Sequence, residues 1–315
     1  MTMPFSKVII WGHKPRTARN RLGRSYTATH SYIHQGYAKA FECLGYEVYW
    51  FDDKDDLSDR DFANTIFFTE GQVDAGIPLC RDAAYVLHSC TSQKYLATGA
   101  RILNLCNYVK FCDSGVSPNY PESAVERINR WTFLDSKNRA VYQPWATDLL
   151  PNEIDQFGIA SFNPNETNLN YVGSTSHDGL APRFRELKRI CRKSGKKLRV
   201  FSELSQSEMI EKVRSSFLSI DLRGDWHREC GYVPCRIFKN LSYGKITGTN
   251  SLWVHRLFDG SLPFGDSVEE LVDNTRIRSE TIQPTEFSKL QMYVRDEHTF
   301  INRAKSLISC LELLQ

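Results

Sequence analysis

The densest group of residues with chemical potential lies in residues 229–251, ECGYVPCRIFKNLSYGKITGTNS. Pro234 opens a predicted helix there, and Arg236 and Lys239 lie one turn apart within it. A helix N-terminus carries unpaired N–H groups and about half a positive charge. An arginine adds a forked pair of donors, and a lysine adds a second cation. The pattern favours a phosphate site, and the competing interpretation is a surface helix with two solvated cations.

Three loops of the second half are expected at the same end of a sheet as this helix. They are Gly173-Ser174-Thr175, Arg223-Gly224-Asp225 leading to Glu229, and Thr249-Asn250-Ser251. Loops and helix N-termini converge at the carboxyl ends of parallel strands, where α/β proteins bind ligands. Glu229 is a candidate catalytic carboxylate, and its structural alternative is to cap its loop or pair with Arg223. The predicted binding residues are Gly173, Ser174, Arg223, Tyr232, Pro234, Arg236, Lys239, Asn250 and Ser251.

Strand and helix patterns alternate along both halves of the chain, which predicts parallel sheets with crossover helices. The periodicity fades between them, where Pro144, Pro151 and Pro164 punctuate a polar stretch. We therefore expect an N-terminal domain over 1–150, a C-terminal domain over 151–295 and a last helix, capped by Asp296, that packs back on the first domain. The predicted strands are 7–12, 46–53, 64–71, 85–90 and 101–109 in the first half, and 169–174, 197–202 and 218–224 in the second. The predicted helices are 30–45, one opened by Pro182, 207–217 and 296–314.

The composition describes an ordinary globular protein of 315 residues, with 41% hydrophobic and 24% charged residues. A net charge of +3 does not by itself require a polyanionic partner. The nine cysteines form no CxxC pair, which is typical of reduced thiols and argues against zinc. The apolar run near the N-terminus is too short for a signal peptide or a membrane span. We therefore expect a soluble, cytoplasmic protein without a metal.

Two histidines of the first half are candidates for acid–base chemistry. His30 and His34 lie four residues apart near the start of a predicted helix, where a neutral imidazole can take a proton from a hydroxyl. His30 is the preferred base, His34 and His13 are weaker candidates, and a structural role is the alternative for each. The loop before this helix carries four arginines, which either bind an anion or simply make the loop basic. They are Arg16, Arg19, Arg21 and Arg24.

The segment GYVPCRIFKNLSYGK resembles the donor-binding helix of GT-B glycosyltransferases. Its layout is similar to the Tyr-Val-Thr-Glu-Lys helix of fucosyltransferases and the Ser-Pro-Arg helix of exostosin-type enzymes. Tyr232 and Val233 match the first pattern, and Arg236 takes the place of the cation that faces the donor diphosphate. NYVGS at 170–174 resembles the strand and glycine turn that begin the donor domain, and EHTFINRAKSLI at 297–308 resembles the closing helix.

This resemblance implies an α/β protein with two Rossmann-like domains that face each other across a cleft. The second domain would bind a nucleoside-diphosphate sugar, with base contacts near Phe201 and Ser202, and the first would bind a glycan or another hydroxyl acceptor. The implied activity is a metal-independent glycosyltransferase of carbohydrate biosynthesis that needs no cofactor beyond its donor substrate. Retaining members carry two glutamates eight positions apart. Glu229 can be the first, but Ile237 stands at the second, so the ribose contact and the stereochemistry stay open.

Other functions remain open at this stage. Residues 183–199, RFRELKRICRKSGKKLR, carry nine cations and one acid, which suits either a solvated amphipathic helix or a contact with DNA. A DNA-base glycosyltransferase of the same fold is therefore the close rival. A sugar-nucleotide epimerase and a non-catalytic glycan or nucleotide-sugar binding protein are the others. Residues 52–56, DDKDD, imitate a metal-binding Asp-x-Asp motif but are better explained as a solvated loop.

Overall fold

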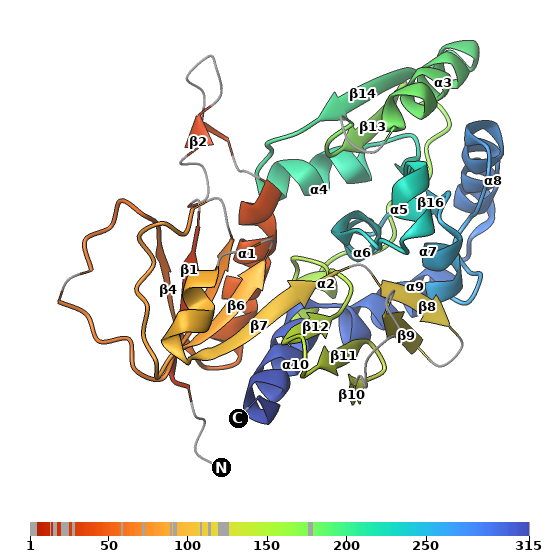
Figure 1. Ribbon diagram of the computed structural model, residues 1–315. Helices are drawn as coiled ribbons and strands as arrows, with labels where there is room; N and C mark the ends of the chain where they lie inside the picture. Colours follow the sequence, from red (N-terminus) through yellow and green to blue (C-terminus); the bar gives the residue numbers. More distant parts are fainter. Residues whose placement is uncertain are drawn as a thin grey trace. The chain divides into compact units, whose positions relative to one another are not determined.

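The computed structural model describes residues 5–12, 14, 18–19, 25–26, 29–57, 59–70, 73–88, 90, 93–107, 109–112, 115–118, 126–175 and 179–314 (Figure 1). The chain divides into two compact units. Unit 1 comprises Met1–Asn107, Tyr120–Gln143 and Phe300–Gln315, and unit 2 comprises Tyr108–Asn119 and Pro144–Thr299. Across the described ranges, no helix is long and apolar enough to cross a membrane.

Unit 1 is built on an eight-stranded sheet with the order β10-β11-β12-β7-β6-β5-β1-β4. Strands β4, β1, β5, β6, β7 and β12 run parallel, and β10 and β11 add an antiparallel edge. The two neighbours of β1 are β4 and β5, so the connections diverge there and create a topological switch point. The strands are β1 (Lys7–Trp11), β4 (Glu47–Phe51), β5 (Thr65–Glu70), β6 (Ala84–His88), β7 (Arg101–Cys106), β10 (Glu126–Asn129), β11 (Thr132–Asp135) and β12 (Ala140–Tyr142).

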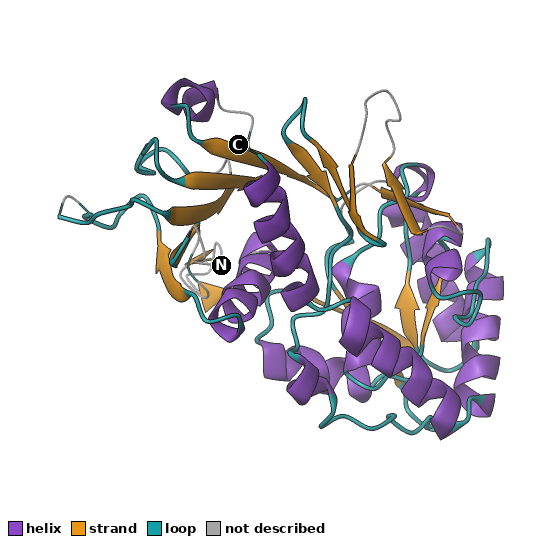
Figure 2. Ribbon diagram, turned by 90° about the horizontal axis from the view of Figure 1, so that it is seen from below, coloured by secondary structure: helices purple, strands orange, loops and turns teal. Residues whose placement is uncertain are grey.

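The central strands β1, β5 and β6 are buried on both faces, which explains why their residues are mainly apolar. Phe68 of β5 meets Tyr37 of α1 (Thr29–Cys43), with ring centroids 4.4 Å apart. The adjacent Phe67 points to the other face and stacks on Tyr85, which lies against the short helix η1 (Gln93–Thr98). Helix α10 (Phe300–Leu313) packs beside α1, where Phe300 lies 4.7 Å from Tyr37 (Figure 2).

Unit 2 holds two parallel strand pairs, β13–β14 and β15–β16. Strand β13 also lies beside β15, because Phe217 N donates to the Asn168 carbonyl over 2.8 Å just before β15 begins. The order is therefore β14-β13-β15-β16, with a second switch point between β13 and β15. The strands are β13 (Asn168–Val172), β14 (Lys197–Phe201), β15 (Ser219–Asp221) and β16 (Thr247–Thr249). The helices are α2 (Pro151–Ile154), α3 (Leu180–Lys193), α4 (Gln206–Arg214), α5 (Asp225–Glu229), α6 (Cys235–Ser242), α7 (Leu252–Leu257), α8 (Val268–Thr281) and α9 (Pro284–Glu297).

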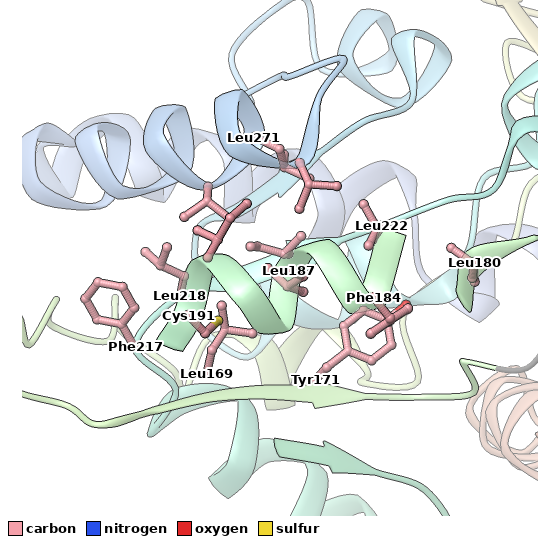
Figure 3. Close-up of a cluster of buried hydrophobic side chains, with 14 residues drawn as sticks. Leu169, Tyr171, Leu180, Phe184, Leu187, Cys191, Phe217, Leu218, Leu222 and Leu271 are labelled. Atoms are coloured by element: carbon pink, nitrogen blue, oxygen red, sulfur yellow. The ribbon is translucent and has the colours of Figure 1, made fainter. Parts of the chain in front are cut away.

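The core of unit 2 forms around the apolar side of α3 (Figure 3). Phe184 and Leu187 point into a cluster that includes Leu218 and Leu271. The Phe184 ring meets Tyr171 of β13 edge to face at 4.7 Å. This packing confirms the predicted amphipathic helix and anchors the strand that leads into the candidate site.

The structure differs from the sequence interpretation at several boundaries. Helix α3 begins at Leu180, before Pro182, and the last helix begins at Phe300. Asp296 does not cap that helix, because it lies in the last turn of α9 and binds Arg295 Nε over 2.8 Å. The first unit gives way to the second after residue 143 rather than 150, and residues 108–119 join unit 2. Short hairpins complete the described elements: β2 (Ala18–Arg19) with β3 (Ser25–Tyr26), and β8 (Val109–Cys112) with β9 (Gly115–Pro118).

Candidate functional site

Arg236 joins the ends of two strands at the switch point of unit 2. Its Nε donates to the Val172 carbonyl over 3.0 Å, and its Nη1 donates to Asp221 Oδ1 over 3.1 Å. Val172 ends β13 and Asp221 ends β15, so the guanidinium lies where such sheets bind ligands. The first turn of α6, opened by Pro234, holds it there, and the Tyr171 ring lies 4.2 Å beneath it.

Arg223 is the second cation of this cluster. Its Nε donates to Asp221 Oδ1 over 2.8 Å, and its Nη2 donates to the same oxygen. Asn250 holds the Arg223 backbone from both sides. The Arg223 N–H donates to Asn250 Oδ1 over 2.7 Å, and Asn250 Nδ2 donates to the Arg223 carbonyl over 2.9 Å. The loop after β15 is therefore fixed by the loop after β16.

Two guanidinium groups share one buried carboxylate, so the cluster of Arg223, Arg236 and Asp221 has a net charge of +1. Burial alone would raise the pKa of Asp221, but the charges and hydrogen bonds of Arg223 and Arg236 outweigh it and hold that pKa below its usual value. Burial would likewise lower the pKa of Arg223, and the Asp221 charge raises it instead. Asp221 and Arg223 therefore both stay charged, and the surplus positive charge of the cluster suits an anion.

Gly173 makes room for Arg236 beside the end of β13. Its φ of +138° is rare for an L side chain, and its N–H donates to the Phe201 carbonyl over 2.8 Å. A Cβ at this position would overlap the Arg236 guanidinium. Arg236 can therefore occupy this position only because residue 173 has no Cβ.

Two buried hydroxyl groups, those of Tyr171 and Ser251, belong to residues next to the cluster. Tyr171 and Ser251 are buried, and among the described residues neither hydroxyl has a hydrogen-bond partner. A buried hydroxyl without a partner is costly, so each is available to a ligand. Tyr171 is the residue whose ring carries Arg236, and Ser251 directly follows Asn250.

Lys239, predicted as a second phosphate contact, is paired with a protein carboxylate instead. Its ammonium forms a buried ion pair with Asp148 Oδ2 over 3.1 Å, and the Tyr243 hydroxyl donates to Asp148 Oδ1 over 2.7 Å. Burial would lower the pKa of Lys239, but the Asp148 charge raises it. The lysine is therefore bound to a protein carboxylate, which does not fit the predicted phosphate contact.

The remaining predicted residues of unit 2 surround the cluster at different distances. The Tyr232 ring lies 5.6 Å from Arg223 Cζ. Phe201 ends β14 and is half-buried, whereas Ser174 and Ser202 are exposed. Glu229 ends α5 as an exposed side chain, and Arg223 pairs with Asp221 rather than with Glu229.

Unit 1 carries a separate buried polar cluster at its own switch point. Glu70 ends β5, and its register partner His88 ends β6. The ring of His34, from α1, lies 5.9 Å from that of His88, and both side chains are buried. A Cβ on Gly12, just after β1, would lie 3.2 Å from His34 Nδ1 and 3.6 Å from Glu70 Oε1. A carboxylate and two imidazoles thus gather at the carboxyl ends of three neighbouring strands, a set suited to proton transfer.

The sequence interpretation found His34 but missed Glu70, His88 and Asp221. Their common signal is a polar residue that ends a buried apolar strand, as in TIFFTE, AYVLH and SID.

His30 lies in the first turn of α1, and its side chain is outside the described residues. Residues 13, 16, 21 and 24 and the Arg19 side chain are also outside them. Within the described residues, no three His, Cys, Asp or Glu side chains are grouped to hold a metal ion.

No protein-family model and no curated protein matches the sequence. Among solved structures, the chain is similar to an alpha-glucosyltransferase in complex with UDP-glucose and DNA containing an abasic site. The two share 9% identity over 98% of this chain and 95% of that chain, with a TM-score of 0.50. Two other solved structures have a TM-score of only 0.23 and support no argument. One is an ABC domain in complex with L-Trp from Streptococcus pneumonia, with 11% identity over 90% of this chain and 87% of that chain. The other is a conserved domain protein from Vibrio cholerae, with 12% identity over 89% and 87%. The chain therefore shares the mixed α/β fold of a glucosyltransferase.

Proposed function

We propose that this chain is a glycosyltransferase that transfers a sugar from a nucleoside-diphosphate sugar to an acceptor hydroxyl. One observation carries the proposal. Arg236 and Arg223 share the buried Asp221 at the switch point of unit 2, which leaves a net positive charge where an α/β sheet binds its ligand. The similar solved structure contains UDP-glucose, a ligand with such a diphosphate.

The proposed chemistry uses the cluster as an electrostatic device. When the bond between sugar and diphosphate breaks, negative charge grows on the leaving diphosphate. Guanidinium groups that are already fixed by Val172 and Asp221 stabilise this charge without reorganising. The hydroxyls of Tyr171 and Ser251 are our candidates for additional donor contacts.

Proton transfer at the acceptor is assigned to the cluster of unit 1. If the reaction inverts the anomeric centre, a base must remove the proton of the acceptor hydroxyl. His34, with Glu70 and His88 around it, is the candidate among the described side chains. His34→Gln is expected to lower kcat about 10²- to 10⁴-fold, the range typical of general acid–base catalysis. An unchanged kcat would remove this assignment while leaving the donor site in place.

The first test is a thermal-shift screen with UDP, GDP, CMP, ADP, TDP and their sugars. A ligand at a hundred times its Kd should add about 2.7 kcal/mol of stability. We expect one nucleotide to stabilise the wild type but not Arg236→Ala, and that variant to lose sugar transfer. Arg276→Ala, on the exposed side of α8, is the matched control and should respond like the wild type. An equal response of Arg236→Ala and wild type would refute the donor site.

A turnover assay with the sugar nucleotide that binds, run with and without an acceptor, separates the rival activities. An epimerase would convert the sugar nucleotide without an acceptor, and a binding protein would bind it without releasing nucleotide. We expect instead that nucleotide release depends on an acceptor hydroxyl.

DNA is the second candidate acceptor. The similar solved structure contains DNA, and in this chain seven exposed cations lie on α3 and β14. A DNA contact should weaken steeply with salt, because bound counterions are released. Absence of binding to duplex DNA at low salt would remove this candidate. The cations are Arg185, Lys188, Arg189, Arg192, Lys193, Lys197 and Arg199.

A further inference from the structure

Unit 2 contains a pocket of about 430 Å³ that is separate from the Arg236 site. The volume falls within the range of about 300–1,000 Å³ found for small-ligand sites. Lys245 lies just before β16 and Asn250 just after it, so the pocket and the Arg236 site are at opposite ends of this strand. The apolar wall of the pocket is made by Ile159, Phe162, Ile246 and Ile282.

Lys245 lines this pocket although it is only 3% exposed. Within the described residues its ammonium makes no ion pair and no hydrogen bond. Its backbone is satisfied, since Lys245 N–H donates to the Asn240 carbonyl over 2.9 Å. Thr247 Oγ1 donates to the Lys245 carbonyl over 3.2 Å. A buried ammonium without a partner is unfavourable, and a bound anion would relieve that cost.

The groups around Lys245 increase the positive character of the pocket. Arg214, which donates to the Tyr243 carbonyl over 2.6 Å, faces the lysine as a second cation. Burial and then Arg214 lower the pKa of Lys245 to about 8, and Glu166 opposes them only in part. Glu280, which lines the pocket, is engaged elsewhere, because Arg276 Nη1 donates to its carboxylate over 3.0 Å.

We propose that this pocket is a binding site for a small organic anion, a carboxylate or a phosphate monoester with an aromatic or branched apolar body. The anionic end contacts Lys245, and the apolar body packs on Phe162, Ile246 and the residues beside them. The site does not depend on the proposed transferase activity, because it shares no residue with the Arg236 cluster.

The test is a fluorine NMR titration with two probes, 4-fluorobenzoate and 4-fluorophenyl phosphate, which distinguish the two anion classes. 4-Fluorobenzamide is the uncharged control. We expect saturable binding of at least one anion at pH 7 and at least tenfold weaker binding of the amide. Equal binding of the amide, or no saturable binding of either anion, would overturn the proposal.

Two variants locate the site. Lys245→Met keeps the length of the side chain without its charge, and it should weaken anion binding at least tenfold. Lys289→Met makes the same change on the exposed side of α9 and should leave binding unchanged. Lys245→Met removes an unpaired buried cation, so it should fold with an equal or higher urea midpoint. Wild-type affinity in the folded variant would contradict the assignment, as would a variant that does not fold.

The pH dependence is a further check. Anion affinity of the wild type should fall roughly tenfold from pH 7 to pH 9, as the Lys245 ammonium loses its proton. The Glu166 carboxylate keeps its charge across this window, because the backbone N–H of Asn168 holds its pKa below the usual value. A constant affinity over this range would argue against contact with Lys245.

Discussion

At the scale of single residues, Asp221 organises the candidate donor site, because both arginines take their position from its carboxylate. The sequence predicted Arg236, Gly173 and Asn250 as binding residues, and the structure places them around Asp221 and Arg223, while their role in donor binding stays a prediction. It did not identify Asp221, since the role of this residue depends on cations two and fifteen positions away that meet only in the folded chain. Lys239 shows the opposite case, because its spacing from Arg236 suggested a shared ligand and Asp148 captures it instead.

Replacing Asp221 with Asn should destabilise the fold by about 3–5 kcal/mol at pH 7, because two buried guanidinium groups lose their counter-charge. The pKa of Asp221 is depressed in the folded state, so its stabilisation is present above the unfolded value of about 3.9. It is lost as the pH falls through the folded value. Urea midpoints of wild type and Asp221→Asn should therefore converge as the pH falls below about 4. A gap that is the same at pH 7 and pH 3 would contradict the buried ion cluster.

Gly173→Ala should abolish donor binding, because a Cβ there would displace the Arg236 guanidinium. Backbone strain at φ +138° adds of order 1–3 kcal/mol of destabilisation. Gly179→Ala is the matched control, with a φ of +66° and open space around the added carbon. It should lose stability but keep nucleotide binding in calorimetry. Loss of binding in both variants would mean that general destabilisation, rather than displacement of Arg236, is the cause.

At the scale of elements, the parallel strands and the helices between them were predictable because buried strands are continuous apolar runs. Helices α8 and α9 were not predicted, since their apolar residues are sparse and widely interrupted by charges. The start of α10 was also missed. Residues 298 and 299 are not helical, because they pair with a distant segment. Thr147 N donates to the His298 carbonyl over 2.9 Å, and Thr147 forms an isolated β-bridge with Thr299.

The contact between α1 and α10 gives a prediction with an unusual sign. A Gly to Ala change inside a helix normally adds about 1 kcal/mol of stability. At Gly36 the new Cβ would overlap the Phe300 ring, so Gly36→Ala should instead destabilise unit 1, by about 1–3 kcal/mol. Urea unfolding followed by circular dichroism measures the difference. A stabilised variant would show that α1 and α10 do not pack this closely.

At the scale of the whole molecule, the two units are each assembled from separated parts of the chain. The sequence predicted two α/β halves, but not that residues 108–119 belong to the second unit rather than the first. Short peripheral segments of this kind carry no periodic signal, so only their tertiary contacts decide which unit they join.

Removing residues 300–315 should affect the units unequally. Helix α10 belongs to unit 1, where it packs on α1, β7 and β10. Hydrogen exchange should therefore accelerate in β1, β5 and β6 of the truncated protein, while β13 and β15 keep their protection. Uniform loss of protection in both units would contradict this division.

The division also has a consequence for the order of synthesis. All segments of unit 2 have left the ribosome once residue 299 is free, whereas unit 1 still lacks α10 at that moment. Domains generally acquire structure from the N-terminus during translation. Of the two units, the one that is begun first is therefore completed second. Until α10 has left the ribosome, the surfaces of α1, β7 and β10 that α10 covers stay exposed.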